Sequence, residues 1–97
     1  MQERFSRQEM LLGEEAVRRL EESSAAVFGI GGVGSYAAEA LARAGVGTLY
    51  LIDGDTVSRS NINRQLIALE STVGRAKAEV MAERIRDINP DGRFFPI

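Results

Sequence analysis

The sequence predicts an α/β protein in which parallel strands alternate with helices. Two observations carry this prediction. Short apolar runs alternate with segments of helical periodicity along the 97 residues, and the resulting order is strand, helix, strand, helix, strand after a separate amino-terminal segment. Strands that are separated by helices pair in parallel through right-handed crossovers. The fold class is therefore α/β with a doubly wound parallel sheet.

The first strand and the first helix are indicated by the stretch from residue 25 to residue 44. The run "AAVFGI" (25–30) is apolar and lies between Ser24 and a group of glycines, which is typical of a strand buried on both faces. From Val33 to about Ala44, small apolar residues recur at helical spacing. Such a helix can lie very close to a sheet, and Gly45 is placed to end it.

The second half repeats this order. "LYLID" (49–53) predicts the second strand, and residues 75–88 predict the second helix, because four apolar residues share one of its faces: Ala78, Met81, Ile85 and Ile88. "NPDG" ends that helix, since the residue before Pro90 is disfavoured in the helical region. "RFFPI" (93–97) predicts the third strand.

We divide the chain into a helical arm, residues 1–24, and a partial Rossmann-like nucleotide-binding domain, residues 25–97. Met10, Leu11, Val17 and Leu20 indicate that the arm packs on its own domain or on a neighbouring subunit. In the usual strand order of this fold the first strand lies in the middle of the sheet. We therefore expect these residues to be the amino-terminal half of a larger protein and to be inactive alone.

Composition excludes several kinds of function for these residues. There is no cysteine and no histidine, which rules out a cysteine nucleophile, disulfides and the commonest general base. A net charge of -2 gives no general basic surface for nucleic acid. The apolar runs are too short to span a membrane, and "MQERFSRQEM" is too charged for a secretory signal. We expect a cytoplasmic protein.

Four glycines between the first strand and the first helix predict a nucleotide site: Gly29, Gly31, Gly32 and Gly34. Glycine permits a tight turn, lets phosphate oxygens approach peptide N–H groups and allows close helix packing, and the helix N-terminus attracts anions. The alternative is a tight turn without a ligand. Asp53 ends the second strand, where an acidic residue accepts ribose hydroxyls. At this point a nicotinamide dinucleotide and ATP fit equally well.

The connection between Asp53 and Gly74 favours ATP. It is much longer than the ~2–6 residues usual between strand and helix, and it carries Asp55, Asn61 and Arg64. A guanidinium offers a planar fork of donors to phosphate oxygens, and an asparagine can reach ribose or phosphate. The alternative is a solvated loop whose asparagines form turns.

Cations near two helix starts also favour a phosphate ligand. Arg75 and Lys77 lie in the first turn of the second predicted helix, where positive charge opposes the helix dipole unless an anion binds between them. We expect Lys77 to be an exposed cation; two solvated charges are the alternative. Arg4 and Arg7 begin the arm, and an arm that crosses a dimer could deliver an arginine to the partner's phosphates.

Four stretches taken together resemble a known family. "RFSRQ", "GIGGVGS", "ARAGVGTLYLIDGDTVSRSNINRQ" and "VGRAKAEVMAERIRDINP" are similar, in that order, to adenylating enzymes of the ThiF/MoeB type, relatives of the ubiquitin-activating enzymes. The resemblance covers residues 4 to about 90. "SNINRQ" and "GRAKAEVMAERIRDINP" are most similar to the tRNA threonylcarbamoyladenosine dehydratases, which are associated with cysteine desulfurases.

The resemblance implies a role for each motif residue. It places the four glycines beneath the ATP phosphates and Asp53 at the ribose, with Asp55 and Asn61 in the same pocket. It makes Arg64 and Lys77 the phosphate-binding, catalytic cations and Arg7 a catalytic arginine supplied across a homodimer. The family's Mg²⁺-binding aspartate lies on a later strand, so the resemblance implies no metal ligand within these residues.

The resemblance also implies a reaction. The carboxylate of threonylcarbamoyladenosine in tRNA attacks the α-phosphate of ATP, and the neighbouring nitrogen then captures the activated carbonyl, giving a cyclised, dehydrated base. Implied partners are tRNA, a cysteine desulfurase in a sulfur relay and a second subunit. One alternative is adenylation of the carboxy terminus of a ubiquitin-like sulfur-carrier protein. The others are an NAD-dependent dehydrogenase and a non-catalytic nucleotide-binding module.

Overall fold

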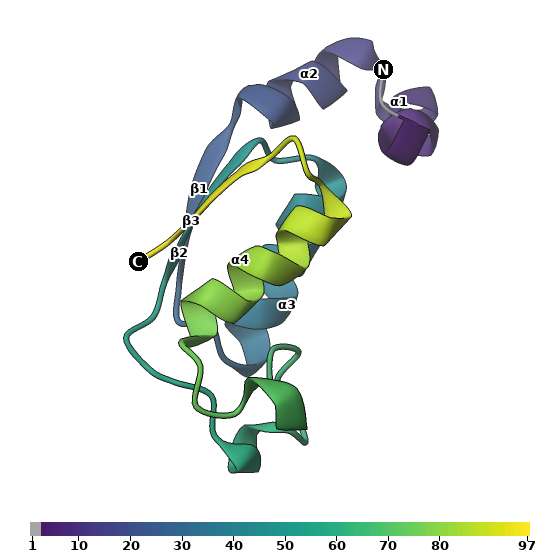
Figure 1. Cartoon of the computed structure of the whole chain (residues 1–97). Helices are drawn as coiled ribbons and strands as arrows, with labels where there is room; N and C mark the ends of the chain where they lie inside the picture. The colour runs from purple at the N-terminus through teal and green to yellow at the C-terminus, as the bar shows by residue number, and fades with distance from the viewer. Residues whose placement is uncertain (1–2) are drawn as a thin grey trace.

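Three parallel strands form the sheet in this computed structural model, which describes residues 3–97 (Figure 1). The strand order is β1 (Ser24–Phe28), β2 (Thr48–Ile52), β3 (Arg93–Pro96). Two helices make the crossovers, α3 (Gly32–Ala44) between β1 and β2 and α4 (Lys77–Ile88) between β2 and β3. The predicted order of strands and helices, the parallel sheet and the α/β class are therefore confirmed.

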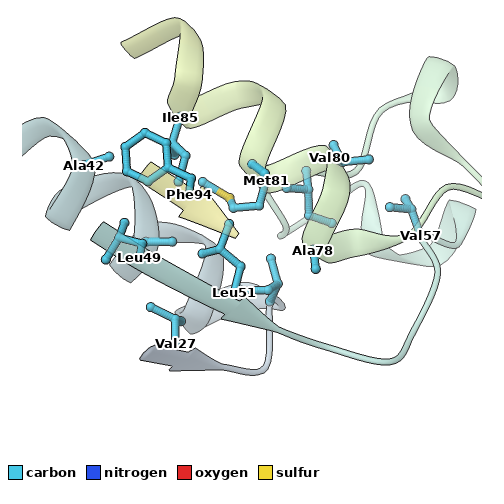
Figure 2. Close-up of a cluster of buried hydrophobic side chains, with 14 of the residues drawn as sticks. Val27, Ala42, Leu49, Leu51, Val57, Ala78, Val80, Met81, Ile85 and Phe94 are labelled. Carbon is cyan, nitrogen blue, oxygen red and sulfur yellow. The ribbon is translucent and has the colours of Figure 1, made fainter. Parts of the chain in front are cut away.

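The core lies between the sheet and the two helices, which cover the same sheet face (Figure 1). Leu49 and Leu51 of β2 are fully buried beneath Met81 and Ile85 of α4, and Phe94 of β3 completes this layer (Figure 2). Small residues of α3, including Ala38 and Ala42, are also fully buried. The apolar face predicted for the second helix is the face that packs.

The other face of the sheet is uncovered within residues 3–97. Ala26, Tyr50 and Phe95 stand in register across the strands, and the rings of Tyr50 and Phe95 stack with centroids 5.4 Å apart. Phe28 at the end of β1 is 76% exposed. The prediction that the first strand is buried on both faces is therefore wrong for this chain. Two successive right-handed crossovers in the same direction leave both helices on one side.

The helix boundaries follow local backbone chemistry. α3 ends at Gly45, which adopts the left-handed conformation with φ of 96°. α4 begins at Lys77, two residues later than predicted, because the preceding backbone is already used elsewhere. Thr56 and Ala76 form an antiparallel bridge, and the carbonyl of Arg75 accepts a hydrogen bond from the N–H of Val57 at 2.8 Å.

The arm consists of two helices, α1 (Ser6–Leu12) and α2 (Glu14–Glu22), separated at Gly13 with φ of 92°. A short 3-10 turn, Glu3–Phe5, precedes them. Val17 and the unpredicted Phe5 are buried, whereas Met10 and Leu11 are 85% and 86% exposed. No helix in residues 3–97 is long and apolar enough to cross a membrane.

The arm packs at the carboxyl ends of α3 and α4. The side-chain amide of Gln8 donates to the carbonyl of Ala44 at 2.5 Å, and the guanidinium of Arg4 donates to the carbonyl of Ile88 at 3.3 Å. Both acceptors lie in the last turn of a helix, where carbonyls lack partners within the helix. The arm therefore packs on its own domain.

Candidate functional site

The turn between β1 and α3 is held against the end of β2. Gly29 has φ of 87°, a conformation that glycine adopts without strain, and its N–H donates to the carbonyl of Ile52 at 2.8 Å. The next N–H, that of Ile30, donates to Oδ2 of Asp53 at 2.6 Å. Two consecutive hydrogen bonds, one to the last residue of β2 and one to the side chain of the residue after it, fix the path of the turn.

The structural reason for glycine differs among the four positions. Gly29 supplies the positive φ, and Gly34 supplies space, because a Cβ at Gly34 would collide with the carbonyl of Gly29. At Gly31 and Gly32 a Cβ would meet its nearest neighbours at 3.5 and 3.9 Å, which is ordinary contact. The protein's own packing therefore does not require glycine at Gly31 and Gly32, and the surface of the turn stays open there.

Four consecutive backbone N–H groups in this turn, those of residues 31–34, have no acceptor within residues 3–97. The N–H groups on either side are bonded, Ile30 to Asp53 and Ser35 to the carbonyl of Gly31. The free groups form the N-terminus of the 13-residue helix α3, whose dipole also favours an anion. A hollow beside the turn is lined by Val27, Val33, Ala37 and Asp53. This arrangement suits a phosphate chain.

Asp53 connects the glycine turn to the start of α4. Its Oδ1 accepts a hydrogen bond from the N–H of Asp55 at 2.7 Å, while its Oδ2 holds Ile30. The carbonyl of Asp55 in turn accepts the N–H of Lys77 at 3.1 Å. The Asp53 carboxylate and one backbone hydrogen bond therefore join three sequence-predicted residues to the turn. The Asp55 side chain remains exposed without a bond in residues 3–97.

Lys77 is buried, with 8% of its surface exposed, so the expectation of an exposed cation is wrong. Within residues 3–97 its ammonium group has neither an ion pair nor a side-chain hydrogen bond. The fully buried side-chain nitrogen and oxygen atoms without a partner in residues 3–97 are Oε2 of Glu9 and Oε1 of Gln65, so the Lys77 ammonium is not enclosed. It reaches the surface at the end of a mostly buried side chain, where an anion can approach it.

Arg75, the other cation at the start of α4, pairs with an acidic residue of that helix. Its guanidinium pairs with both carboxylate oxygens of Glu83, further along α4. This hydrogen-bonded pairing lowers the pKa of Glu83 and raises that of Arg75. Of the two cations at this helix start, Lys77 alone remains available to an anion.

The connection after β2 folds back over the glycine turn. Asn61 is buried and accepts the N–H of Ser58 at 3.0 Å, so one of its side-chain atoms forms a turn, as the alternative interpretation held. Arg64 is exposed, and its guanidinium donates to the Ser60 carbonyl and the Asn63 side chain at 3.1 and 3.0 Å. Only its backbone carbonyl lies beside Gly32.

Gln65 lies on the glycine turn, although the sequence analysis gave it no role of its own. Its side chain is 9% exposed and lies against Gly31: a Cβ on that glycine would be 3.5 Å from Nε2 of Gln65. Its Oε1 is buried without a hydrogen-bond partner in residues 3–97. Its place directly after Arg64 was the available signal, but sequence alone does not distinguish a buried amide from a solvated one.

Arg7 lies far from the glycine turn of its own chain. It is an exposed residue of α1, and α1 packs at the carboxyl end of α3, whereas the glycine turn lies at the amino end (Figure 1). The 13 residues of α3 separate the two ends by roughly 20 Å. Residues 3–97 contain no group of three acidic, His or Cys residues that could hold a metal ion.

Residues 5–95 match the ThiF family. The tRNA threonylcarbamoyladenosine dehydratase of Bacillus subtilis is 55% identical over 94% of this chain, which spans 36% of that protein. The adenylyltransferase and sulfurtransferase uba4 of Aspergillus clavatus is 40% identical over 96% of this chain, which spans 19% of it.

A solved structure gives the same result. The tRNA N6-threonylcarbamoyladenosine dehydratase of Escherichia coli, crystallised in complex with ATP, superposes with a TM-score of 0.94 at 54% identity. The match covers 97% of this chain and 39% of that one. The chain therefore spans well under half the length of the relatives that it matches, and its fold corresponds to one part of theirs.

Proposed function

The chain belongs to the ThiF family, and we propose that it supplies the ATP-binding part of an enzyme that modifies tRNA. In this proposal the enzyme activates the carboxylate of threonylcarbamoyladenosine by adenylation and promotes its cyclising dehydration, in the cytoplasm. Support comes from the 55% identity with the Bacillus subtilis dehydratase and from the ATP complex of the Escherichia coli protein.

One observation carries the nucleotide part of the proposal. Within residues 3–97, four unpaired N–H groups at the start of α3 are connected through Asp53 and Asp55 to the backbone of Lys77 at the start of α4, and the ammonium of this mostly buried side chain has no partner. Two helix N-termini and one cation on the same hydrogen-bonded framework form an anion site much stronger than either helix alone. A triphosphate has the charge and the length to use both.

The proposed chemistry has two steps. A carboxylate oxygen attacks the α-phosphorus of ATP, the bond to the β-phosphate oxygen breaks and pyrophosphate leaves, forming an acyl-adenylate. The neighbouring nitrogen then attacks the activated carbonyl, AMP leaves with the former carboxylate oxygen and the nitrogen loses its proton. The protein's contribution is positioning and charge stabilisation, for which Lys77 and the free N–H groups are suited.

Further roles rest on the family resemblance. We assign Asp53 and Asp55 to the nucleoside end, with Asn61 nearby, and Arg64 to the phosphates. That assignment requires the exposed Arg64 guanidinium to exchange its bonds to Ser60 and Asn63 for phosphate oxygens. Mg²⁺ would neutralise charge on the leaving pyrophosphate, and we propose that its protein ligands lie outside residues 3–97.

We also propose that the enzyme works as a homodimer in which Arg7 serves the partner's site. Arg7 cannot reach the glycine turn of its own chain across the length of α3. Met10 and Leu11, on the same short helix, expose their apolar side chains almost completely, as residues at a subunit interface would before assembly. A cysteine desulfurase remains an expected partner from the family resemblance.

The second candidate substrate is the carboxy terminus of a ubiquitin-like sulfur-carrier protein. The 40% identity with the uba4 adenylyltransferase and sulfurtransferase favours it, because the nucleotide chemistry would be the same. The dehydratase relatives are more similar to this chain, so tRNA is our first choice.

Two experiments test these proposals. Calorimetry with ATP and with NAD should show binding of ATP only, and binding of NAD only would favour a dehydrogenase. For the substrate, residues 5–95 can replace the corresponding segment of the Bacillus subtilis dehydratase. The hybrid should release pyrophosphate with tRNA that carries threonylcarbamoyladenosine. A response only to a carrier protein that ends in Gly-Gly would overturn the choice of tRNA.

A further inference from the structure

A second hollow lies at the opposite end of the two crossover helices from the glycine turn. It has a volume of about 580 Å³ and lies between the start of the arm and the carboxyl-terminal halves of α3 and α4. Six residues line this arginine hollow: Arg4, Phe5, Arg43, Arg84, Asp87 and Ile88. Three of them are arginines and one is acidic, although the whole chain has a net charge of -2. Positive charge is therefore concentrated at this place.

The guanidinium groups of Arg43 and Arg84 are held at one edge and free at the other. The carboxylate of Glu39 accepts a hydrogen bond from Nε of Arg43 at 3.3 Å and another from Nε of Arg84. No hydrogen bond within residues 3–97 uses the terminal NH₂ groups of either side chain. Each arginine therefore keeps a planar pair of donors, which fits two oxygens of one phosphate group.

Arg4 adds a third guanidinium from the arm. Its Nη1 donates to the carbonyl of Ile88 and to Oδ1 of Asn89, both at 3.3 Å, which fixes it at the end of α4. Three positive charges thus gather around two negative ones, those of Glu39 and of Asp87, whose side chain has no bond within residues 3–97. Like charges held close together repel, and a bound anion would relieve that repulsion.

We propose that the arginine hollow binds backbone phosphate groups of the RNA substrate, as an anion site separate from the glycine turn. This inference rests on the proposed tRNA-modifying function. The 13 residues of α3 separate the hollow from the turn by roughly 20 Å, the length of about six base steps of a nucleic-acid helix. One RNA molecule can therefore place a base near the nucleotide and its backbone in the hollow.

Backbone contacts carry no sequence information, so the hollow should bind RNA that lacks the modified base. The test measures binding of a fluorescent RNA stem-loop to the full chain by anisotropy at several salt concentrations. Arg43→Gln and Arg84→Gln should each weaken binding about fivefold and reduce the salt slope by about 1. Arg19→Gln is the matched control, because Arg19 also pairs with a glutamate of its own helix and does not line the hollow; it should change neither quantity.

A gain of affinity gives a second test that does not depend on breaking an ion pair. Asp87 is exposed, and its side chain is unbonded within residues 3–97, so Asp87→Asn should leave the melting temperature unchanged. It removes a negative charge from the hollow and should tighten RNA binding about twofold. Asp91→Asn makes the same change of charge at an exposed position outside the hollow. Equal tightening by both variants would overturn the proposal.

The outcomes separate this inference from the function beneath it. Equal weakening of RNA binding by all three arginine variants, or no RNA binding by the unmodified chain, would overturn the inference alone. Sedimentation detects the other possible occupant, a second copy of the chain. If Arg43→Gln or Arg84→Gln dissociates a dimer and leaves RNA binding unchanged, the hollow is a subunit contact and the inference is overturned. The proposed function itself fails only if the hybrid enzyme releases no pyrophosphate with modified tRNA.

Discussion

The carboxylate of Asp53 accepts a hydrogen bond from the backbone N–H of Ile30 at 2.6 Å. The residue proposed to bind ribose is thus also the residue that holds the glycine turn in place. Its other oxygen positions Asp55, whose carbonyl holds the first residue of α4. One side chain therefore connects the two helix N-termini of the candidate site.

Asp53→Asn should destabilise the fold as well as weaken nucleotide binding. An amide keeps the shape but replaces one of two acceptors with a donor, which then faces a backbone N–H. We expect the free energy of unfolding to fall by about 1–3 kcal/mol, measured by urea denaturation. Asp55→Asn is the control, since that side chain is exposed and unbonded within residues 3–97; an equal loss there would contradict the role of the Asp53 carboxylate.

Two glycine substitutions should have different consequences. Gly34→Ala forces a Cβ into the carbonyl of Gly29 and should cost about 3 kcal/mol or more in stability. Gly32→Ala meets nothing closer than 3.9 Å, so it should fold normally and lose affinity for ATP because the methyl group occupies the phosphate's path. Melting curves and calorimetry on both variants check this, and normal ATP binding by Gly32→Ala would argue against phosphate at that surface.

Lys77→Met should abolish most ATP binding without lowering the melting temperature. Methionine is similar in length and keeps the apolar contacts of the mostly buried stem, and within residues 3–97 the lysine has no ion pair to lose. We expect at least a tenfold loss of affinity, roughly the value of one hydrogen bond to a charged group. Lys77 is the only lysine in the chain, so its protection by ATP from amine-modifying reagents can be followed directly by peptide mass spectrometry.

Arg75→Met serves as the control for Lys77. It removes a neighbouring cation whose guanidinium is already paired with Glu83, so ATP affinity should stay near that of the unmodified chain. A loss equal to that of Lys77→Met would mean that general positive charge, and not the ammonium of Lys77 in particular, attracts the nucleotide.

Mixing two inactive variants of the hybrid enzyme tests whether Arg7 acts across a dimer. Equal amounts of Arg7→Ala and Lys77→Met subunits form mixed dimers in which one of two sites has both residues. Random pairing should restore about a quarter of the normal pyrophosphate release. Activity that stays at background after subunit exchange would contradict supply of Arg7 by the partner.

Glu39 should make the stability of the helix pair depend on pH. Its carboxylate accepts hydrogen bonds from Arg84 of α4 and Arg43 of α3, and the pairing with Arg84 is the main reason that its pKa is lowered. Because the pKa of this carboxyl group is lower in the folded chain than in the unfolded chain, its ionised form stabilises the fold at pH values above the unfolded pKa. That contribution is lost as the pH falls through the folded pKa.

Glu39→Gln should therefore cost about 1 kcal/mol near pH 7 and nothing at a pH below both pKa values, which chemical denaturation across pH 3–7 would measure. The exposed Glu15, paired with Arg19 on the same helix, is the control position. A constant difference at every pH would contradict an ionic contribution.

The sequence by itself determined the order of the elements, the parallel sheet, the end of α3 at Gly45 and the glycine turn. These are local properties, since apolar spacing and backbone conformation depend on residues close together in the chain. The sequence also predicted a tight turn and close helix packing for the four glycines together. Only the structure assigned the positive φ to Gly29 and the close packing to Gly34.

Tertiary structure decided which polar side chains are buried and what each one contacts. Lys77 was expected in solvent and is buried, Arg75 was expected beside it and pairs with Glu83, and Gln65 was passed over although its amide lies on the glycine turn. Burial depends on what the long connection between β2 and α4 folds against, and that is set by contacts between residues far apart in the chain. The apolar periodicity of a segment does not depend on such contacts. The helices could therefore be predicted from sequence, but the burial and the partners of the residues at their N-termini could not.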